Sequence, residues 1–192
     1  MANNRTLLKE KMRRLGLREP SLSLFYNALE EVHYKKGTKI IKAGRTEPHL
    51  YFILDGIARV FIQTAEKETV FCFCLETDVI LSYNSFFNES PGYETIELLE
   101  DSQLVRVSHR KVKALCKSDL TIANFFNRLI GLELVKTEER LIGTQSRTAT
   151  ARYTELITLF PSIVQRVQLG YIASYLGVSQ VTLSRIRKKI SR

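Results

Sequence analysis

The sequence predicts an α+β protein, in which an N-terminal antiparallel β-roll (a double-stranded β-helix) is followed by a long helix and a C-terminal helix-turn-helix domain. From residue 32 onward, apolar residues alternate with a period of two in six to eight short segments separated by turns. Near residue 118 the period becomes helical. We therefore divide the chain into residues 1–117, 118–145 and 146–192.

Composition places the chain among ordinary globular proteins, with 44% hydrophobic and 26% charged residues in a total of 192. No apolar run approaches the roughly 18 residues of a membrane span, and the first residues lack the apolar block of a signal peptide. We expect a cytoplasmic protein with no membrane partner. Cys72, Cys74 and Cys116 are the three cysteines, too few and too scattered for a disulfide framework. We interpret "FCFC" as small buried residues of a strand, and expect no metal site.

The N-terminal 31 residues suggest two helices with a break at Glu19-Pro20. The roll then begins with "VHYKKGTKII", two strands around a Lys-Gly turn. The next segment, "YFILDGIARVFIQ", places Asp55-Gly56 between two strand-like runs, which predicts a β-hairpin. "TVFCFCL" and "SQLVRVS" are further strands.

The long helix is expected to begin after Ser118 or Asp119, either of which is a good N-cap. Between residues 120 and 135 its apolar residues crowd more than one face, so both sides must be buried. One side would cover the sheet. The other would pack against a second copy of the helix in a two-fold dimer, or alternatively within a larger monomer. The predicted dimerisation residues are Ile122, Phe125, Phe126, Leu129, Ile130 and Leu132.

Charge is unevenly distributed along the chain. The net charge is +9, and no acidic residue follows Glu155. Such asymmetry indicates a polyanionic partner, with double-stranded DNA the first candidate, although a solubilising basic tail is the alternative. The positive residues of this last segment are Arg166, Arg185, Arg187, Lys188, Lys189 and Arg192.

The segment "QLGYIASYLGVSQVTLSRIRKK" has the pattern of two short helices that cross at a tight turn. Gly177 supplies the turn and Ala173 is the small residue at the crossing. The internal apolar positions are Ile172, Leu176, Val178, Leu183 and Ile186.

Ser179 would cap the second helix, whose outward residues are polar or basic. Arg185 suits a guanine edge, Gln180 an adenine edge, and Val181 a thymine methyl group. Phosphate contacts are expected from the remaining positions. These are Ser179, Thr182, Lys188 and Lys189.

"YFILDGIARVF", the long amphipathic helix and "IASYLGVSQVTLSRIRKK" together resemble the Crp/Fnr family of bacterial transcription regulators. The resemblance implies a cyclic-nucleotide-binding-type roll, a dimerisation helix and a winged-helix-like domain. It also implies base-reading positions at Gln180, Val181, Ser184 and Arg185, a homodimer, and RNA polymerase as a further candidate partner. In the sequence given, little follows the second helix, so any wing would come from "PSIVQRV".

The region that corresponds to the family's phosphate-binding segment departs from the family pattern. From Glu76 to Gln103 there is no Lys or Arg, and seven residues are acidic. An anionic phosphate would be uncompensated there, which argues against cyclic AMP as effector. No cofactor is expected and the effector is unknown. Tyr83, Asn84 and Ser85 are the candidate pocket residues, although aromatic residues of this segment equally suit the core of the roll.

The sequence therefore predicts a homodimeric DNA-binding regulator that reads an inverted repeat. The alternative is a sensor of a cyclic nucleotide or another small molecule whose basic C-terminus does not bind specific DNA. An enzyme is not expected, because the sequence shows no nucleophile–base motif, phosphate-cradling Gly-rich loop or cluster of metal ligands.

Overall fold

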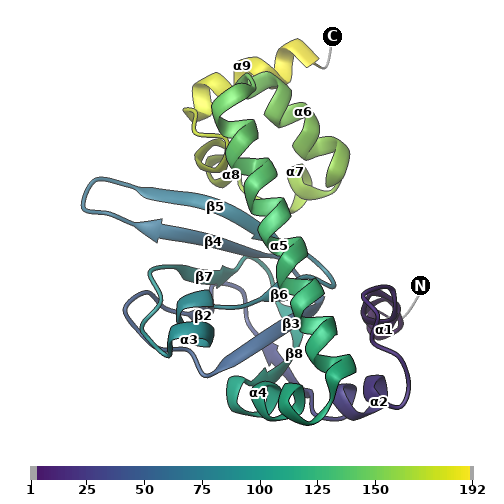
Figure 1. The fold of residues 1–192 in the computed structure, drawn as a ribbon. Helices are drawn as coiled ribbons and strands as arrows, with labels where there is room; N and C mark the ends of the chain where they lie inside the picture. The colour runs from purple at the N-terminus through teal and green to yellow at the C-terminus, as the bar shows by residue number, and fades with distance from the viewer. Residues whose placement is uncertain (1–3, 191–192) are drawn as a thin grey trace.

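The computed structural model describes residues 4–190 (Figure 1). Two helices, α1 (Asn4–Arg14) and α2 (Ser21–Tyr26), precede the strands. The strands are β1 (Glu30–Tyr34), β2 (Lys39–Ile41), β3 (His49–Asp55), β4 (Ala58–Gln63), β5 (Glu68–Cys74), β6 (Val79–Ile80), β7 (Thr95–Leu98) and β8 (Ser102–Ser108), with the short helix α3 (Tyr83–Asn88) between β6 and β7.

The strands form two four-stranded antiparallel sheets, in the orders β1-β8-β3-β6 and β2-β7-β4-β5. Consecutive strands mostly lie in different sheets, so the chain winds around a shared apolar interior. Ile53, Ile80 and Leu104 of one sheet face Val60, Ile96 and Leu98 of the other in one buried cluster. The predicted antiparallel roll is confirmed.

The predicted hairpin at Asp55-Gly56 is wrong, although the turn is real. β3 pairs with β8 and β6, whereas β4 pairs with β5 and β7. Gly56, at φ +125°, carries the chain from one sheet to the other, and a Cβ at this position would overlap Ser102 Oγ. The local signal fixed the change of direction, but the longer ladders with β8 and β5 decided the pairing.

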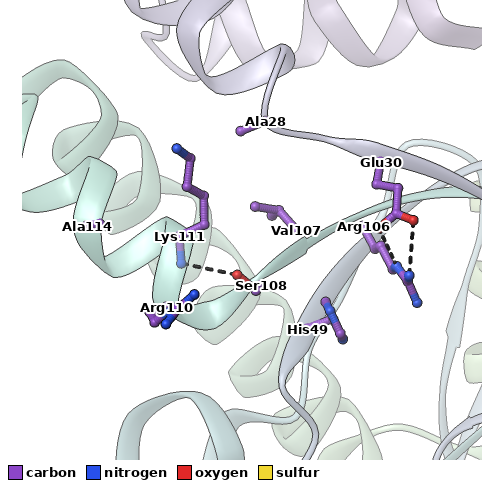
Figure 2. A pocket seen from close by; sticks show the side chains of 9 residues that line it. All are labelled: Ala28, Glu30, His49, Arg106, Val107, Ser108, Arg110, Lys111 and Ala114. Carbon is purple, nitrogen blue, oxygen red and sulfur yellow. Dashed lines mark hydrogen bonds and ion pairs between the residues drawn. The ribbon is translucent and has the colours of Figure 1, made fainter.

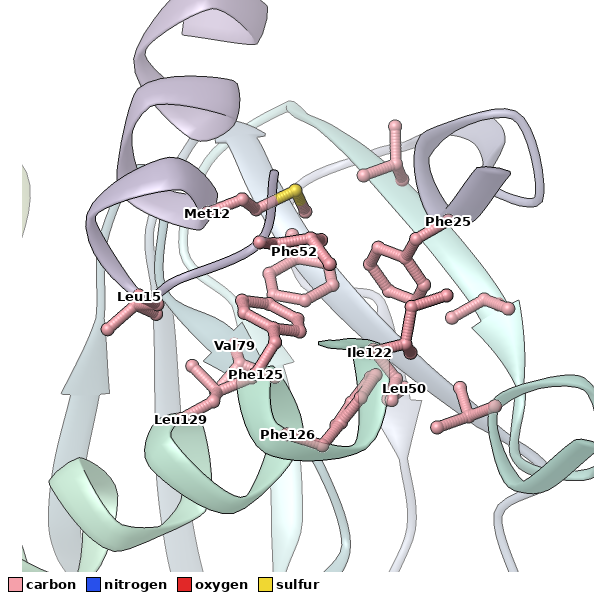
Figure 3. Close-up of a cluster of buried hydrophobic side chains, with 14 of the residues drawn as sticks. Met12, Leu15, Phe25, Leu50, Phe52, Val79, Ile122, Phe125, Phe126 and Leu129 are labelled. Carbon is pink, nitrogen blue, oxygen red and sulfur yellow. The ribbon is translucent and has the colours of Figure 1, made fainter. Parts of the chain in front are cut away.

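Two consecutive helices follow the roll, α4 (His109–Ser118) and α5 (Leu120–Ser146). Asp119 is the N-cap of α5, because its Oδ1 accepts hydrogen bonds from the backbone N–H groups of Thr121 at 2.8 Å and Ile122 at 3.1 Å. The first half of α5 lies against the roll and the N-terminal helices (Figure 3). There the ring of Phe25 lies 5.7 Å from Phe125 and 5.4 Å from Phe126, centroid to centroid.

This packing corrects the predicted dimerisation set. Ile122, Phe125, Phe126 and Leu129 are all buried in the core of their own chain. The prediction required a second helix to cover them, and α2 together with α4 supplies that cover. Ile130 is half-buried, and of the predicted set only Leu132 is exposed.

The described part of the C-terminal domain is entirely helical: α6 (Ala149–Leu159), α7 (Ile163–Arg166), α8 (Leu169–Tyr175) and α9 (Gln180–Ile190). Residues 161–167, expected to supply a wing, contain α7 instead. Figure 1 shows these helices stacked at the end of the molecule where β4 and β5 project, joined to the roll by α5. Within residues 4–190, no helix is both long and apolar enough to cross a membrane.

Candidate nucleic-acid interface and the contact behind it

The predicted helix-turn-helix is present in α8 and α9. Gly177 has φ +65°, and the N–H of Val178 donates to the carbonyl of Ala173 at 3.0 Å, which closes α8 as the chain turns. The expected internal residues are buried, except Val178, which is half-buried. The buried set is Ile172, Ala173, Leu176, Leu183 and Ile186.

The first turn of α9 is built by its own polar side chains. Ser179 Oγ accepts a hydrogen bond from the N–H of Thr182 at 3.1 Å, so Ser179 caps the helix as expected. Gln180 extends back over α8, where a Cβ on Gly170 would lie 2.6 Å from Gln180 Nε2. Gly170 therefore leaves the space that the Gln180 amide occupies.

The outward face of α9 carries the residues predicted to contact DNA. Gln180, Val181, Thr182, Arg185, Lys188 and Lys189 are exposed, and Ser184 is half-buried. Val181 is 62% exposed, an apolar side chain presented at the start of a basic helix. No acidic residue occupies the first turn, and the last turn holds Arg187, Lys188 and Lys189. The structure thus brings the predicted set together on one helix, whereas Arg192 lies outside the described residues.

Arg166 has a different role from the one its charge suggested. Its Nη2 lies 2.6 Å from Glu76 Oε1, and it also pairs with Glu100, so this guanidinium joins the C-terminal domain to the roll. The hydrogen bonds that Arg166 donates to Glu76 and Glu100 raise the pKa of Arg166 above its usual value. Burial opposes ionisation of Glu76, but the bonds from Arg166 prevail and lower the pKa of that carboxyl. Arg166 therefore neutralises carboxylates of the roll.

The β4–β5 hairpin holds α8 through further contacts. Ser174 Oγ accepts from the N–H of Val70 at 3.0 Å and donates to the carbonyl of Glu68 at 3.2 Å. The ring of Phe73 lies 5.3 Å from that of Tyr175. Sequence reasoning missed this contact. The sequence offers one sign that this domain contacts the roll, which is Arg166, the only charged residue between residues 156 and 184.

Arg59, on β4, is buried in the same contact. Its guanidinium pairs with Glu68 and Glu97 and lies 3.8 Å from the ring centroid of Tyr171. Arg106 lies elsewhere, on the outer surface of the roll, where it bonds Glu30 at the rim of a cavity of about 480 Å³ (Figure 2). Arg59 and Arg106 are thus each already paired with glutamates.

The candidate pocket residues all lie on α3, where two of them serve local structure. Asn84 Nδ2 donates to the carbonyl of Pro91 at 2.7 Å. Ser85, which is buried, donates from Oγ to the carbonyl of Ser90 at 3.1 Å. Tyr83 is exposed.

Beside α3, two buried polar atoms of the described residues lack a hydrogen-bond partner: Ser82 Oγ and Glu94 Oε1. Both lie against Gly92, where a Cβ would be 2.5 Å from Ser82 Oγ and 3.0 Å from Glu94 Oε1. An acidic, acceptor-rich corner of this kind is unsuited to a phosphate.

A second cavity, of about 350 Å³, lies where the roll, α5 and the C-terminal domain meet. The roll contributes Cys72 and Cys74 to its lining, and α5 contributes Lys136 and Arg140. The C-terminal domain contributes Arg152, Glu155 and apolar residues that include Leu156. Asp78, Glu133 and Glu139 also line this cavity. Within residues 4–190, no three His, Cys, Asp or Glu residues are grouped to hold a metal ion.

The second half of α5 leaves apolar side chains exposed. Leu134 and Leu141 are 68% and 57% exposed, and each has an exposed neighbour, Val135 and Ile142 respectively. The two pairs are separated by seven residues, which places them on one face of the helix. This exposed face begins two residues beyond Leu132, the last residue predicted for dimerisation and itself exposed.

Comparison with known proteins identifies the fold. Residues 31–119 match the cyclic nucleotide-binding domain family. No curated protein sequence matches the chain. Among solved structures, a transcriptional regulator of the Crp/Fnr family from Eubacterium rectale is 20% identical, with a TM-score of 0.71 over 91% of this chain and 84% of that one.

Two further solved structures show the same likeness. FixK2 from Bradyrhizobium japonicum is 19% identical, with a TM-score of 0.70 over 85% of this chain and 84% of that one. CLP from Xanthomonas campestris, a c-di-GMP-responsive global regulator, is 16% identical, with a TM-score of 0.67 over 88% and 90%. Residues 31–119 are therefore similar to the cyclic nucleotide-binding domain family, and the chain has the fold seen in solved structures of Crp/Fnr transcriptional regulators.

Proposed function

We propose that this protein is a DNA-binding transcription regulator of the Crp/Fnr type that reads an inverted-repeat operator as a homodimer. The observation that carries the proposal is the outward face of α9. Two buried residues, Leu183 and Ile186, fix the helix on its domain, while its exposed side carries polar and basic groups and no carboxylate. Such a face suits the major groove, with base edges near the helix start and phosphates along its flanks.

The exposed face of α5 supports the dimer. A seam formed by Leu134, Val135, Leu141 and Ile142 is costly to leave in water, and a second copy related by a two-fold axis would cover it with an identical seam. A dimer built this way would present two α9 helices. The half-sites would then be separated by about one helical turn of DNA, roughly 34 Å.

We propose that the roll senses an unidentified effector or has lost sensing, and that cyclic AMP is not its effector. The corner formed by Ser82 and Glu94 contains a buried carboxylate oxygen without a partner, and Arg59 and Arg106 are each engaged with glutamates. Bringing either arginine to a ligand would leave those carboxylates unpaired.

Selection of bound sequences from a random duplex library, followed by fluorescence anisotropy at several salt concentrations, tests the proposal. We expect an inverted repeat to be enriched and to bind at least a hundredfold more tightly than a scrambled duplex. Equal affinity for every duplex, with a steep salt dependence, would instead support the alternative of a sensor with a merely basic tail.

A further inference from the structure

Two cysteines of β5 share one wall of the 350 Å³ cavity. Cys72 and Cys74 are two residues apart on the same strand, so their side chains lie on the same face. Both are free thiols; Cys74 is buried and Cys72 is half-buried, which makes the pair reachable through the cavity. The two thiols lie close enough to each other to interact directly.

The geometry favours a bridging ion over a disulfide. Cα atoms two residues apart on a strand are roughly 6.6 Å apart, close to the ~6.8 Å upper limit for a disulfide. Metal–sulfur bonds of about 2.3 Å allow the two bridged sulfurs to lie up to about 4.6 Å apart. A bridging ion therefore requires less distortion of the strand than a disulfide does. Harder ions and zinc need further ligands, and no third ligating residue joins the two thiols within residues 4–190.

Arg140 is the cation beside the pair, in a cavity that is also lined by Asp78, Glu133, Glu139 and Glu155. Its guanidinium packs over the ring of Phe71 at 5.6 Å and lies beside Cys72. Two thiolates and one monovalent cation carry a net charge of −1, which one guanidinium offsets. Asp78, which lines the same cavity, is held by Lys11 and Lys136, so its carboxylate is already compensated.

We propose that Cys72 and Cys74 form a two-coordinate site for a soft monovalent metal ion, with Cu(I) as the fitting biological ion. Binding forms two metal–sulfur bonds and releases the two thiol protons to solvent, with no change in oxidation state. Phe73 lies between the two ligands and contacts Tyr175 of α8, so an ion here would act on the strand that holds the helix-turn-helix. An effect of the ion on DNA binding rests on the proposed function; the site itself does not.

Anaerobic titration of the full-length chain with Cu(I), in competition with a chromogenic Cu(I) chelator, tests the site. We expect one Cu(I) per chain, with affinity falling at least a hundredfold in Cys72→Ser and in Cys74→Ser. Cys116→Ser, at a half-buried cysteine of α4, is the matched control and should bind like wild type. Unchanged binding in both β5 variants, or no retained copper in the wild type, would overturn the proposal.

A second measurement avoids variants that fail to fold. In the wild-type protein, Cu(I) should protect Cys72 and Cys74 from alkylation, read by peptide mass mapping, while Cys116 reacts at the same rate with or without the ion. Equal reactivity of all three cysteines in the presence of Cu(I) would contradict the site. If the wild-type chain binds Cu(I) but does not bind DNA, the result counts against the proposed function and not against the copper site.

Discussion

Arg166 of α7 and Glu76 of the roll lie 2.6 Å apart, Nη2 to Oε1, and this ion pair joins the C-terminal helices to the roll. Glu100 approaches the same guanidinium, and both carboxylates are partly buried. Without Arg166, two neighbouring carboxylates would face each other at the domain contact. The contact between the C-terminal helices and the roll therefore includes a charge that lies outside α9.

Arg166→Gln should loosen this contact. We expect a loss of unfolding free energy on the order of 1–3 kcal/mol, because two partly buried carboxylates lose their partner. Urea unfolding measures the loss, and faster amide exchange in α8 would localise it. Arg147→Gln is the control, since the pair of Arg147 with Glu155 is exposed and its removal should change little. A smaller effect at residue 166 than at residue 147 would contradict this account.

Arg185→Ala and Lys188→Ala should weaken DNA binding in different ways. Removing Arg185 should cost on the order of 1–3 kcal/mol and relax preference at one base pair of each half-site. Removing Lys188 should weaken all duplexes about equally and lower the salt slope by about one per lost phosphate contact, so about two per dimer. Anisotropy against single-base variants of the selected site separates the two. Altered base preference on loss of Lys188 would mean that α9 docks nearer its C-terminal end.

Substitutions at two leucines of α5 should distinguish residues that stabilise the fold from residues that form the dimer. Leu129→Ala opens the core and should cost about 2–5 kcal/mol of stability while the oligomeric state is retained. Leu141→Glu places a charge in the exposed seam and should yield a folded monomer. Light scattering at tens of micromolar, with thermal unfolding of both variants, checks the assignment. A wild-type monomer under those conditions would remove the dimer and the inverted-repeat expectation with it.

His109 should make stability fall in mild acid. Burial lowers its pKa from 6.5 to about 4, and the ring packs 4.9 Å from that of Phe86. Because the folded pKa is depressed, the unfolded chain takes up a proton first as pH falls. Between pH 7 and 5 the loss should be about 2 kcal/mol. His109→Phe should flatten this dependence, whereas His33→Gln, at an exposed histidine, should leave it unchanged. If urea unfolding shows that the stability of His109→Phe falls with pH as steeply as that of the wild type, His109 does not have this role.

Cyclic AMP should bind weakly or not at all. Isothermal titration should show no heat of binding at micromolar concentrations, because the buried, unpartnered carboxylate oxygen of Glu94 would repel a phosphate. A low-micromolar or tighter dissociation constant would show that an arginine leaves its glutamates to reach the ligand, and Arg59→Gln would then identify it.

Periodicity and turn chemistry were enough to predict the roll, the long helix and the helix-turn-helix. The positive-φ Gly177, the small Ala173 and the apolar stripe through Leu183 and Ile186 specify two crossing helices locally, because each requirement involves residues close in sequence. The same locality explains why the predicted DNA-contact residues lie together on α9.

Tertiary structure decided what local patterns leave open. Asp55-Gly56 fixes a reversal, but β8 and β5 determined which strands pair across it. The apolar faces of α5 required burial, but α2 and α4 determined that Phe125 and Phe126 are core and that Leu134 and Leu141 stay exposed. A basic residue in an acid-free segment suggested a polyanion, yet Arg166 meets two glutamates brought from 66 and 90 residues away. Burial and ion pairing depend on distance in space, which the sequence does not record.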